Sequence, residues 1–471
     1  MAMTGIPVIN DQLDTMNAIL ARIAMGQNLQ PKSYEEIQSI VRLGLAPKVF
    51  SIGDIIEVGK ETAIQASLGE HTGITGISIN EEIFVTKMNE AGEKEYEFIY
   101  DGSVWKCNGE NIILADYGLS VTGTPAEGDT FIVVETATVI EFQVAGFIEN
   151  GKSGAIKIKN NSLKNGMILH SKKIIYGLQF DASEAMYYCE EGLAAGTYTF
   201  SISTTWGTAT AGNYQFTLTQ PVPAGGQIVG VYKIADVDPS NWTLKTYASA
   251  LSTTEIETVS VSSGNSGTSL GELKVAKDGN MNSIQRCGYG SSNWKTSAIR
   301  QHLNSAAKAG SVWTPQTNFD RPPSWANSTA GFMHGLDPNF IKIIADCEID
   351  TILDNVCDGT SEAATAGTNY ETSIDKFFLP SRSEVYGAAE NNSDKGVPFD
   401  LYKINSDYQS ANGGADSNRI KVNMSGVAAI WWLRAPHPGY AYYPRSVYTS
   451  GQVGYNNACY AGGLTPACVI A

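Results

Sequence analysis

Apolar residues near the N-terminus recur at helical spacing. Ile9, Leu13, Met16, Leu20 and Ile23 follow the alternating four- and three-residue spacing of a coiled-coil seam. The pattern predicts a helix that either packs on its own domain or pairs with copies of itself.

A second helix is predicted to begin at Ser33, which forms a capping box with Glu36. Gly44 and Pro47 are expected to end it. Its apolar face would consist of Ile37, Ile40 and Val41. We therefore expect residues 1–47 to form an N-terminal helical segment for anchoring and oligomerisation.

From about residue 48 the apolar period changes to two, which is typical of strands. Asp101-Gly102 lies between two short apolar runs and predicts a hairpin turn. Further strands are predicted at 112–114, 130–134 and 139–144. These elements predict a small β-sandwich over residues 48–147.

Two more domains are expected. Residues 148–223 resemble a second small β-sandwich, with strands at 196–200 and 214–218. The Pro- and Gly-rich stretch 221–226 would be a linker to an α+β domain over 224–471. Helices are expected there near 297–307 and 338–349. The fold class is thus multidomain and mainly β, with an α+β C-terminal domain.

Charge and composition narrow the possible partners. The chain has 48 acidic and 32 basic residues, a net charge of −16, which disfavours phosphate-mediated binding of nucleic acid. No apolar run is long enough for a membrane span, and no signal peptide is visible. The 7 cysteines contain no CxxC pair, so we expect free thiols rather than disulfides or a zinc site.

Catalytic motifs are weak. Gly267-Thr268-Ser269-Leu270-Gly271 matches the GxSxG pattern, but it lies in a Gly/Ser-rich stretch without a preceding apolar strand. The segment 290–296 lacks the glycine that a phosphate loop places before its lysine. The 5 histidines show no metal-ligand spacing. We therefore expect no catalytic residues, no metal, no cofactor and no enzyme activity.

The most informative segment lies near the C-terminus. It opens with Trp431-Trp432-Leu433-Arg434-Ala435-Pro436, and the window 437–463 then contains six tyrosines, five glycines and one charged side chain, Arg445. Tyr, Ser, Gly and Asn are the residues that antibody paratopes favour, because tyrosine is stiff and amphipathic while the small residues adapt. A tyrosine-rich hairpin that covers a core is the alternative.

The window interleaves two kinds of position. Residues of a scaffold type, including Val447, Gly451 and Val453, alternate with residues that can all be encoded by changing the two adenines of an AAC codon. The predicted variable, ligand-binding positions are His437, Gly439, Tyr440, Tyr442, Tyr443, Ser446, Tyr448, Thr449, Ser450, Gly454, Tyr455, Asn456, Asn457, Cys459, Tyr460 and Gly462. The predicted scaffold residues are Trp431, Trp432, Arg434, Val447, Val453 and Pro466.

This arrangement resembles the variable proteins of diversity-generating retroelements. The opening at 431–436 is similar to the family's Trp-Trp-Leu-Arg-Ser-Pro, with Ala435 in place of serine. The closing Gly463-Leu464-Thr465-Pro466 lacks the family's arginine, so a salt bridge at that position is not expected. Phe377-Phe378-Leu379-Pro380-Ser381 is also similar to the family. The resemblance implies a C-type-lectin fold over roughly 225–471, with the variable region at 437–462.

The resemblance further implies a phage or prophage tail-tip receptor-binding protein. Its partners would be a host-cell surface protein or glycan and other virion tail proteins. It would be a homotrimer assembled in the host cytoplasm into the virion, without membrane insertion. The alternatives are a structural tail, fibre or cell-surface display protein that is not diversified, and an enzyme related to sulfatase-modifying oxidases.

Two structural expectations follow. At least one of Trp431 and Trp432 should be buried behind the binding face. Eleven of the variable positions should form one contiguous exposed patch, because only side chains that a partner can touch are selected, while Val447 and Val453 point inward. These are His437, Gly439, Tyr440, Tyr442, Tyr443, Ser446, Tyr448, Tyr455, Asn456, Asn457 and Tyr460.

Overall fold

The computed structural model divides the chain into two compact units, one formed by residues 1–56, 142–333 and 342–471 and a smaller one formed by residues 57–141 and 334–341. The expected seam from Ile9 to Ile23 lies outside the described residues. The structure describes residues 31, 33–68, 73–75, 87–88, 94–114, 120–122, 124–202, 211–231, 243–250, 252–272, 281–353, 370–387, 395–403, 417–437 and 440–471.

The helix predicted after Ser33 is confirmed as α2 (Tyr34–Arg42), and the Ser33 side chain accepts a hydrogen bond from the backbone N–H of Glu36. Its apolar face is buried, with Ile40 and Val41 at 1% and 0% exposure. Gly44 follows the helix at φ +72°. Pro47 instead lies in the first turn of a second short helix, α3 (Ala46–Val49), where a missing N–H costs nothing.

The smaller unit is built on a sheet in which β8 pairs with β4, β4 with β5, and β5 with β6. The predicted hairpin is confirmed, since Tyr100 pairs with Trp105 and Gly102 has φ +91°. The strands predicted at 130–134 and 139–144 are instead one continuous strand, β8. The strands are β1 (Ile55–Leu68), β2 (Gly73–Thr75), β3 (Lys87–Met88), β4 (Lys94–Tyr100), β5 (Trp105–Cys107), β6 (Glu110–Ile112), β7 (Ser120–Thr122) and β8 (Thr130–Ile148).

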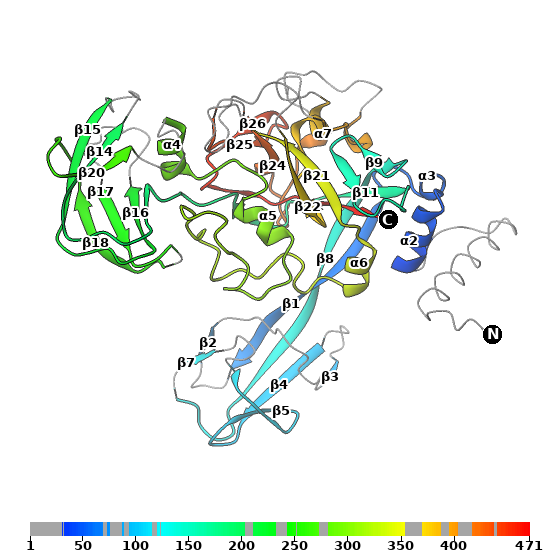
Figure 1. The fold of residues 1–471 in the computed structure, drawn as a ribbon. Helices are drawn as coiled ribbons and strands as arrows, with labels where there is room; N and C mark the ends of the chain where they lie inside the picture. The colour runs from blue at the N-terminus through cyan, green and yellow to red at the C-terminus, as the bar shows by residue number, and fades with distance from the viewer. Residues whose placement is uncertain are drawn as a thin grey trace, which may run out of the picture. The chain divides into compact units, whose positions relative to one another are not determined.

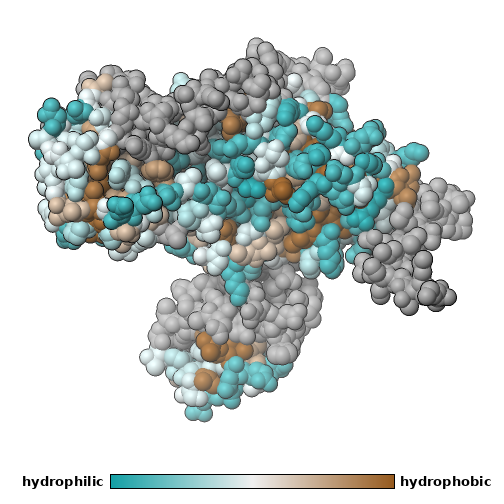
Figure 2. All heavy atoms as spheres, in the orientation of Figure 1, coloured by the Kyte–Doolittle hydropathy of each residue, from teal (hydrophilic) through white to brown (hydrophobic). Residues whose placement is uncertain are grey.

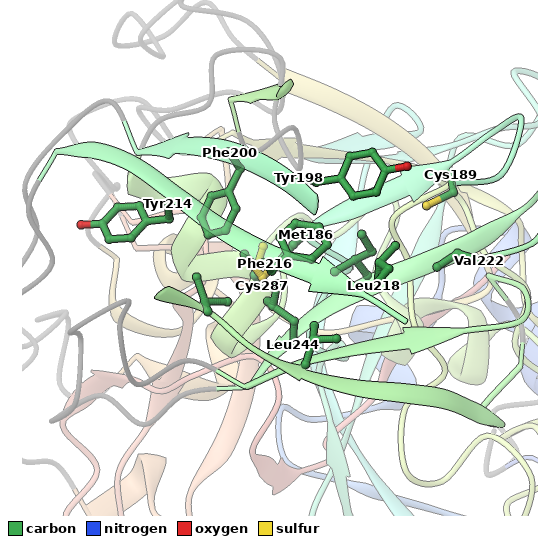
Figure 3. Close-up of a cluster of buried hydrophobic side chains, with 13 residues drawn as sticks. Met186, Cys189, Tyr198, Phe200, Tyr214, Phe216, Leu218, Val222, Leu244 and Cys287 are labelled. Carbon is green, nitrogen blue, oxygen red and sulfur yellow. The ribbon is translucent and has the colours of Figure 1, made fainter. Parts of the chain in front are cut away.

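A two-sheet β-sandwich lies within the larger unit (Figure 1), with sheet orders β13-β16-β17-β18 and β19-β15-β14-β20. The side chains between the two sheets are aromatic and aliphatic, among them Phe200, Phe216 and Leu244 (Figure 3). The strands are β13 (Tyr187–Cys189), β14 (Gly196–Ile202), β15 (Gly212–Leu218), β16 (Gly226–Val231), β17 (Thr243–Tyr247), β18 (Glu255–Ser260), β19 (Ser262–Ser263) and β20 (Thr268–Glu272).

This sandwich crosses the expected domain boundary at 223/224. The predicted strands β14 and β15 pair antiparallel as expected. The stretch 221–226, however, connects one sheet of the sandwich to the other, and Val222 is buried in the common core. The segment was predicted to be a linker because Pro and Gly dominate it, but a turn between two packed sheets requires the same residues.

The remaining strands of the larger unit bring residues 142–179 together with the C-terminal third of the chain. One sheet has the order β23-β28-β11-β8, a second has the order β22-β21-β10-β9, and a third has the order β12-β27-β24-β25-β26. The strands not yet located are β9 (Lys152–Ser153), β10 (Ile156–Ile158), β11 (Gly166–Ser171), β12 (Gly177–Gln179), β21 (Cys347–Ile352), β22 (Tyr370–Asp375), β23 (Phe377–Phe378), β24 (Trp431–Pro436), β25 (Pro444–Val447), β26 (Val453–Tyr455), β27 (Ala461–Gly463) and β28 (Ala467–Ile470).

The last strand, β28, lies in the interior of its sheet. It pairs with β11 on one side and β23 on the other, both antiparallel. Its four residues are all fully buried. Residues 148–179 therefore belong to the same body as the C-terminal third, and the expected domain over 148–223 is divided between this body and the sandwich, which begins with β13.

Helices in this part of the chain are shorter than the sequence pattern indicates. The helix expected at 297–307 is α5 (Ala298–Leu303), capped by Ser297. The one expected at 338–349 is α6 (Pro338–Ile343), after which the chain enters β21. The others are α4 (Met281–Tyr289) and α7 (Arg382–Tyr386), with 3₁₀ turns η4 (Asp400–Tyr402) and η5 (Ser417–Arg419).

Buried polar groups join the strands to the loops. His170 on β11 contacts the Tyr402 hydroxyl through Nδ1 at 2.8 Å and the Thr465 carbonyl through Nε2 at 3.1 Å. Lys421 donates from Nζ to the Ser171 carbonyl at 2.5 Å, and burial lowers the pKa of its ammonium to about 7. Because each group has partners, the core tolerates their polarity.

The described part of the chain is mainly β and divided into several sheets of mostly antiparallel strands, which confirms the coarse fold prediction. On the face of the larger unit shown in Figure 2, hydrophilic residues cover much of the coloured surface and hydrophobic residues lie in separate patches. No helix among the described residues has the length and hydropathy needed to cross a membrane.

Candidate binding surface

The floor of the candidate surface is strand β24, and all six of its residues are buried. Both tryptophans at its start have 0% exposure, so the expected burial of at least one is confirmed. The indole N–H of Trp431 donates to the Arg419 carbonyl and that of Trp432 donates to the Leu178 carbonyl, each at 3.0 Å. A fully buried indole needs such a partner.

Arg434 of β24 forms a buried bidentate ion pair with Glu384 of α7. Nη1 and Nη2 of the arginine each donate to one carboxylate oxygen at 2.6 Å, and both side chains have 0% exposure. Nη1 also donates to the Leu379 carbonyl at 2.8 Å. Parallel N–H···O bonds of this kind fix orientation as well as distance. The predicted scaffold role of Arg434 is thus explained by a partner that sequence reasoning did not identify.

A hairpin next to β24 carries half of the window. Strand β25 pairs antiparallel with β24 on one side and with β26 on the other. Val447 is fully buried, whereas Val453 is half-buried at the strand opposite. Pro466, the last predicted scaffold residue, is also buried.

The aromatic residues of the window pack against one another. The ring centroids of Tyr442 and Tyr443 are 4.0 Å apart, and those of Tyr443 and Tyr455 are 4.8 Å apart. His437 lies edge-on to Tyr455 at 4.7 Å and to Tyr440 at 5.0 Å. Such tilted and edge-to-face geometries are the favourable ones for aromatic pairs. We call these five residues the aromatic cluster.

The sixteen predicted variable positions divide by exposure, and Gly439 lies outside the described residues. The exposed ones are Tyr440, Thr449, Ser450, Tyr455 and Tyr460. The half-buried ones are His437, Tyr443, Tyr448, Asn456 and Cys459. The buried ones are Tyr442, Ser446, Gly454, Asn457 and Gly462.

The expected exposed patch is therefore wrong at three of its members. Tyr442 has 5% exposure because its ring packs 5.3 Å from that of Tyr289, at the end of α4. Asn457 has 3% exposure because the chain after it is hydrogen-bonded to Tyr442, with the Ala458 N–H donating to the Tyr442 carbonyl. Ser446 on β25 is fully buried, as is Val447 on the opposite face of the strand, so both faces of the sheet are covered there.

Two predicted variable glycines are packed too closely to accept a side chain without rearrangement. A Cβ at Gly462 would lie 2.4 Å from Cε2 of Trp432, whose ring is fully buried. A Cβ at Gly454 would lie 2.4 Å from the ring of Tyr448. The Tyr448 ring is half-buried and can move aside, whereas the Trp432 ring is enclosed by core. Gly462 thus behaves as scaffold in this fold.

Tyr289 packs against Tyr442 of the aromatic cluster, a contact that the sequence did not predict. Burial and the neighbouring rings raise the pKa of its hydroxyl. Its carbonyl accepts from the Cys459 N–H at 2.8 Å, which ties α4 to the segment carrying Tyr460. No sequence signal marks it, because α4 is far from the window along the chain. The sequence shows Arg445 only as the one charged side chain of the window. In the structure its guanidinium lies 6.0 Å from the centroid of the Tyr455 ring.

The geometry offers little for nucleophilic chemistry. Burial raises the pKa of the half-buried Cys459 thiol to about 11 and that of the fully buried Cys468 thiol above its usual range. Both therefore remain thiols rather than reactive thiolates at neutral pH. Ser269 of the GxSxG match lies in strand β20 rather than on a strand-to-helix elbow. In the described ranges, no three His, Cys, Asp or Glu side chains come together as a metal site.

One protein family matches this region of the chain. A family described as a domain of unknown function (DUF6273) matches residues 271–471, which include α4, the aromatic cluster and β28. No curated protein and no solved structure matches the chain.

Proposed function

We propose that the chain is a variable protein of a diversity-generating retroelement, with a C-type-lectin fold in its C-terminal part. It acts as a tail-tip receptor-binding protein of a phage or prophage. The surface that binds the host-cell ligand comprises Tyr440, Tyr443, Tyr448, Tyr455 and Tyr460, together with the polar residues between them. The ligand is a surface protein or glycan, and the chain performs no catalysis.

The observation that supports the proposal is the contrast between the buried residues of β24 and the exposed tyrosines of the window 437–463. Trp431, Trp432 and Arg434 are fully buried and hydrogen-bonded beneath the window. Tyr440 and Tyr455 have 42% exposure and Tyr460 has 48%, although tyrosine is usually more covered. Exposed tyrosines on a fixed base offer large contact area at a small cost in conformational entropy.

The body formed by residues 142–179 and the C-terminal third of the chain supports the proposed lectin-type head through the way it begins and ends. Strand β11, near its start, and strand β28, at its end, are neighbours in one sheet. Both strands are buried along their whole length. Because the two strands are held together in one sheet, the loops between them can vary without changing that sheet.

The adenine pattern of the codons can be tested directly by sequencing DNA. We expect an adenine-rich near-copy of codons 431–470 close to the gene, and gene copies from one population should differ at the corresponding positions. The differences should concentrate at the ten exposed or half-buried positions and avoid Gly462. A single invariant gene without a near-copy would favour a structural tail, fibre or display protein instead.

Binding is tested by removing tyrosine side chains of the candidate surface while leaving the buried residues of β24 unchanged. The triple variant Tyr440→Ala, Tyr455→Ala, Tyr460→Ala should abolish adsorption of particles to host cells with a nearly unchanged melting temperature, because these exposed positions contribute little to stability. Tyr188→Ala on β13, which is half-buried, is the control and should leave adsorption intact. Unchanged adsorption by the triple variant contradicts the proposed surface.

A further inference from the structure

Helix α7 is fixed to the floor of the candidate surface. It begins with a complete capping box, in which the Ser381 hydroxyl accepts from the Glu384 N–H and the Glu384 carboxylate accepts from the Ser381 N–H. The same carboxylate holds Arg434 of β24 through two bonds. Both ends of this ion pair have 0% exposure, so α7 has little freedom relative to β24.

Tyr386, the last residue of α7, contacts the hairpin formed by β25 and β26. The Tyr386 hydroxyl donates to the Gly451 carbonyl at 2.9 Å, and Tyr386 is 1% exposed. The guanidinium of Arg419 lies 4.3 Å from the centroid of the Tyr386 ring, while its Nε donates to the Val385 carbonyl. The tyrosine ring is therefore held in place independently of the hairpin.

Gly451 closes the turn between β25 and β26. The turn is tight, since the Tyr448 N–H donates to the Gln452 carbonyl at 2.8 Å and the Gly451 N–H donates to the Tyr448 carbonyl at 2.9 Å. Gly451 has φ +78°, a conformation that favours glycine. Thr449 and Ser450 are exposed at the tip, and Gly451 itself is buried.

We propose that Tyr386 is a positioning residue for the binding surface: its hydroxyl fixes the turn that presents Tyr448, Thr449 and Ser450. This inference rests on the proposed function. The acceptor is a main-chain carbonyl, so the anchor is indifferent to the side chains that occupy the tip. A surface that changes its side chains needs supports of this kind, because a side-chain partner would be lost with each change.

The positioning role is tested by Tyr386→Phe, which removes the hydroxyl and keeps the ring against Arg419. Tyr402→Phe is the matched control, because that tyrosine is also 1% exposed and its hydroxyl contacts the His170 side chain at 2.8 Å rather than the hairpin backbone. Hydrogen–deuterium exchange of the peptide 444–455 should be about tenfold faster in Tyr386→Phe, as expected for loss of one buried hydrogen bond, and unchanged in Tyr402→Phe. Equal exchange in the wild type and Tyr386→Phe overturns the proposal.

A selection experiment links the turn to binding. Libraries with positions 440, 443, 448, 449, 450 and 455 randomised are displayed on the wild-type and Tyr386→Phe backgrounds and selected against lysozyme as a probe. Binders from the Tyr386→Phe library should dissociate about tenfold faster, at similar melting temperatures. A wild-type library that yields no binders contradicts the proposed function, while the exchange result still decides the role of Tyr386. Equal dissociation rates from the two libraries contradict the link between the turn and binding.

Discussion

At the scale of residues, Tyr442 and Tyr443 are adjacent in the chain and their rings are 4.0 Å apart, yet they have different surroundings. Tyr443 is half-buried and faces Tyr455, whereas Tyr442 packs against Tyr289 with 5% exposure. Burial raises the pKa of the Tyr442 hydroxyl above its usual value. Two residues of one type in one motif thus serve the core and the surface separately.

The first prediction separates these roles by stability. Tyr442→Ala should lower the free energy of unfolding by about 3 kcal/mol, because it leaves a cavity beside Tyr289. Tyr455→Ala should change the free energy by about 0.5 kcal/mol or less, because that ring is 42% exposed. Urea denaturation measures both, and equal losses would show that the cluster is a single core.

The second prediction concerns Gly462. Gly462→Ser should cost about 1–3 kcal/mol, since its Cβ would meet the enclosed Trp432 ring. Ala461→Ser is the control, because that neighbour is exposed and already carries a Cβ. Thermal melting compares the two variants. A fully stable Gly462→Ser protein would return Gly462 to the variable set.

The third prediction uses the buried Lys421. Burial lowers its pKa to about 7, below the unfolded value of about 10.4, so between these values the unfolded chain binds more protons than the folded one. Stability should therefore rise from pH 7 to pH 9, by at most about 1.4 kcal/mol per pH unit from this group. Lys421→Met should flatten that rise in urea denaturation. The same slope in both proteins would assign the pH dependence to other groups.

At the scale of elements, strand β24 is the one on which the others depend. It lies between β27 and β25, and its Arg434 binds α7. The pattern Trp-Trp-Leu-Arg predicts a buried strand, but a lone arginine in a buried strand does not reveal its partner. Glu384 is separated from it by about fifty residues of chain, so only the tertiary fold brings the two charges together.

The fourth prediction tests this pair. Glu384→Gln should lower the free energy of unfolding by about 3–5 kcal/mol, because it leaves the Arg434 guanidinium buried without a counter-charge. The double variant Glu384→Leu, Arg434→Met should cost less than Glu384→Gln, since it leaves no unpaired charge. Chemical denaturation of the two proteins checks the order. A double variant less stable than Glu384→Gln would mean that the pair is favourable beyond charge compensation.

Sequence patterns located elements better than they located faces. The helix start at Ser33, the hairpin at Asp101-Gly102 and the strands β14 and β15 follow from local spacing, and the structure contains them. Period-two alternation groups residues by face, but it cannot tell whether both faces are covered. Ser446 and Val447 point to opposite faces of β25, and both are fully buried. The covering segments come from elsewhere in the chain.

At the scale of the whole molecule, the order of the chain and the grouping of its parts differ. The sandwich of β13 to β20 is inserted between β12 and α4, and residues on both sides of it belong to one body. A boundary read from Pro and Gly content marks turns inside a sandwich as readily as linkers between domains. That is why the expected division at 223/224 does not match the packing.

The fifth prediction concerns the charge of the whole chain. The net charge of −16 acts at long range, whereas Arg445 is the one charged side chain between 437 and 471. Raising the salt concentration should therefore change the association rate with a charged partner and leave the dissociation rate nearly constant. Surface plasmon resonance of a selected binder between 50 and 500 mM salt separates the two rates. A dissociation rate that rises steeply with salt would place ion pairs in the contact.

The interior position of β28 has a consequence for the gene. The codons for this buried strand lie downstream of those for the aromatic cluster, so any insertion or deletion that shifts the reading frame between 437 and 462 also replaces β28. Such a chain loses the strand between β11 and β23 and cannot complete its sheet. We expect such chains to misfold and be degraded, so that only sequences that keep the reading frame through this segment give a complete protein.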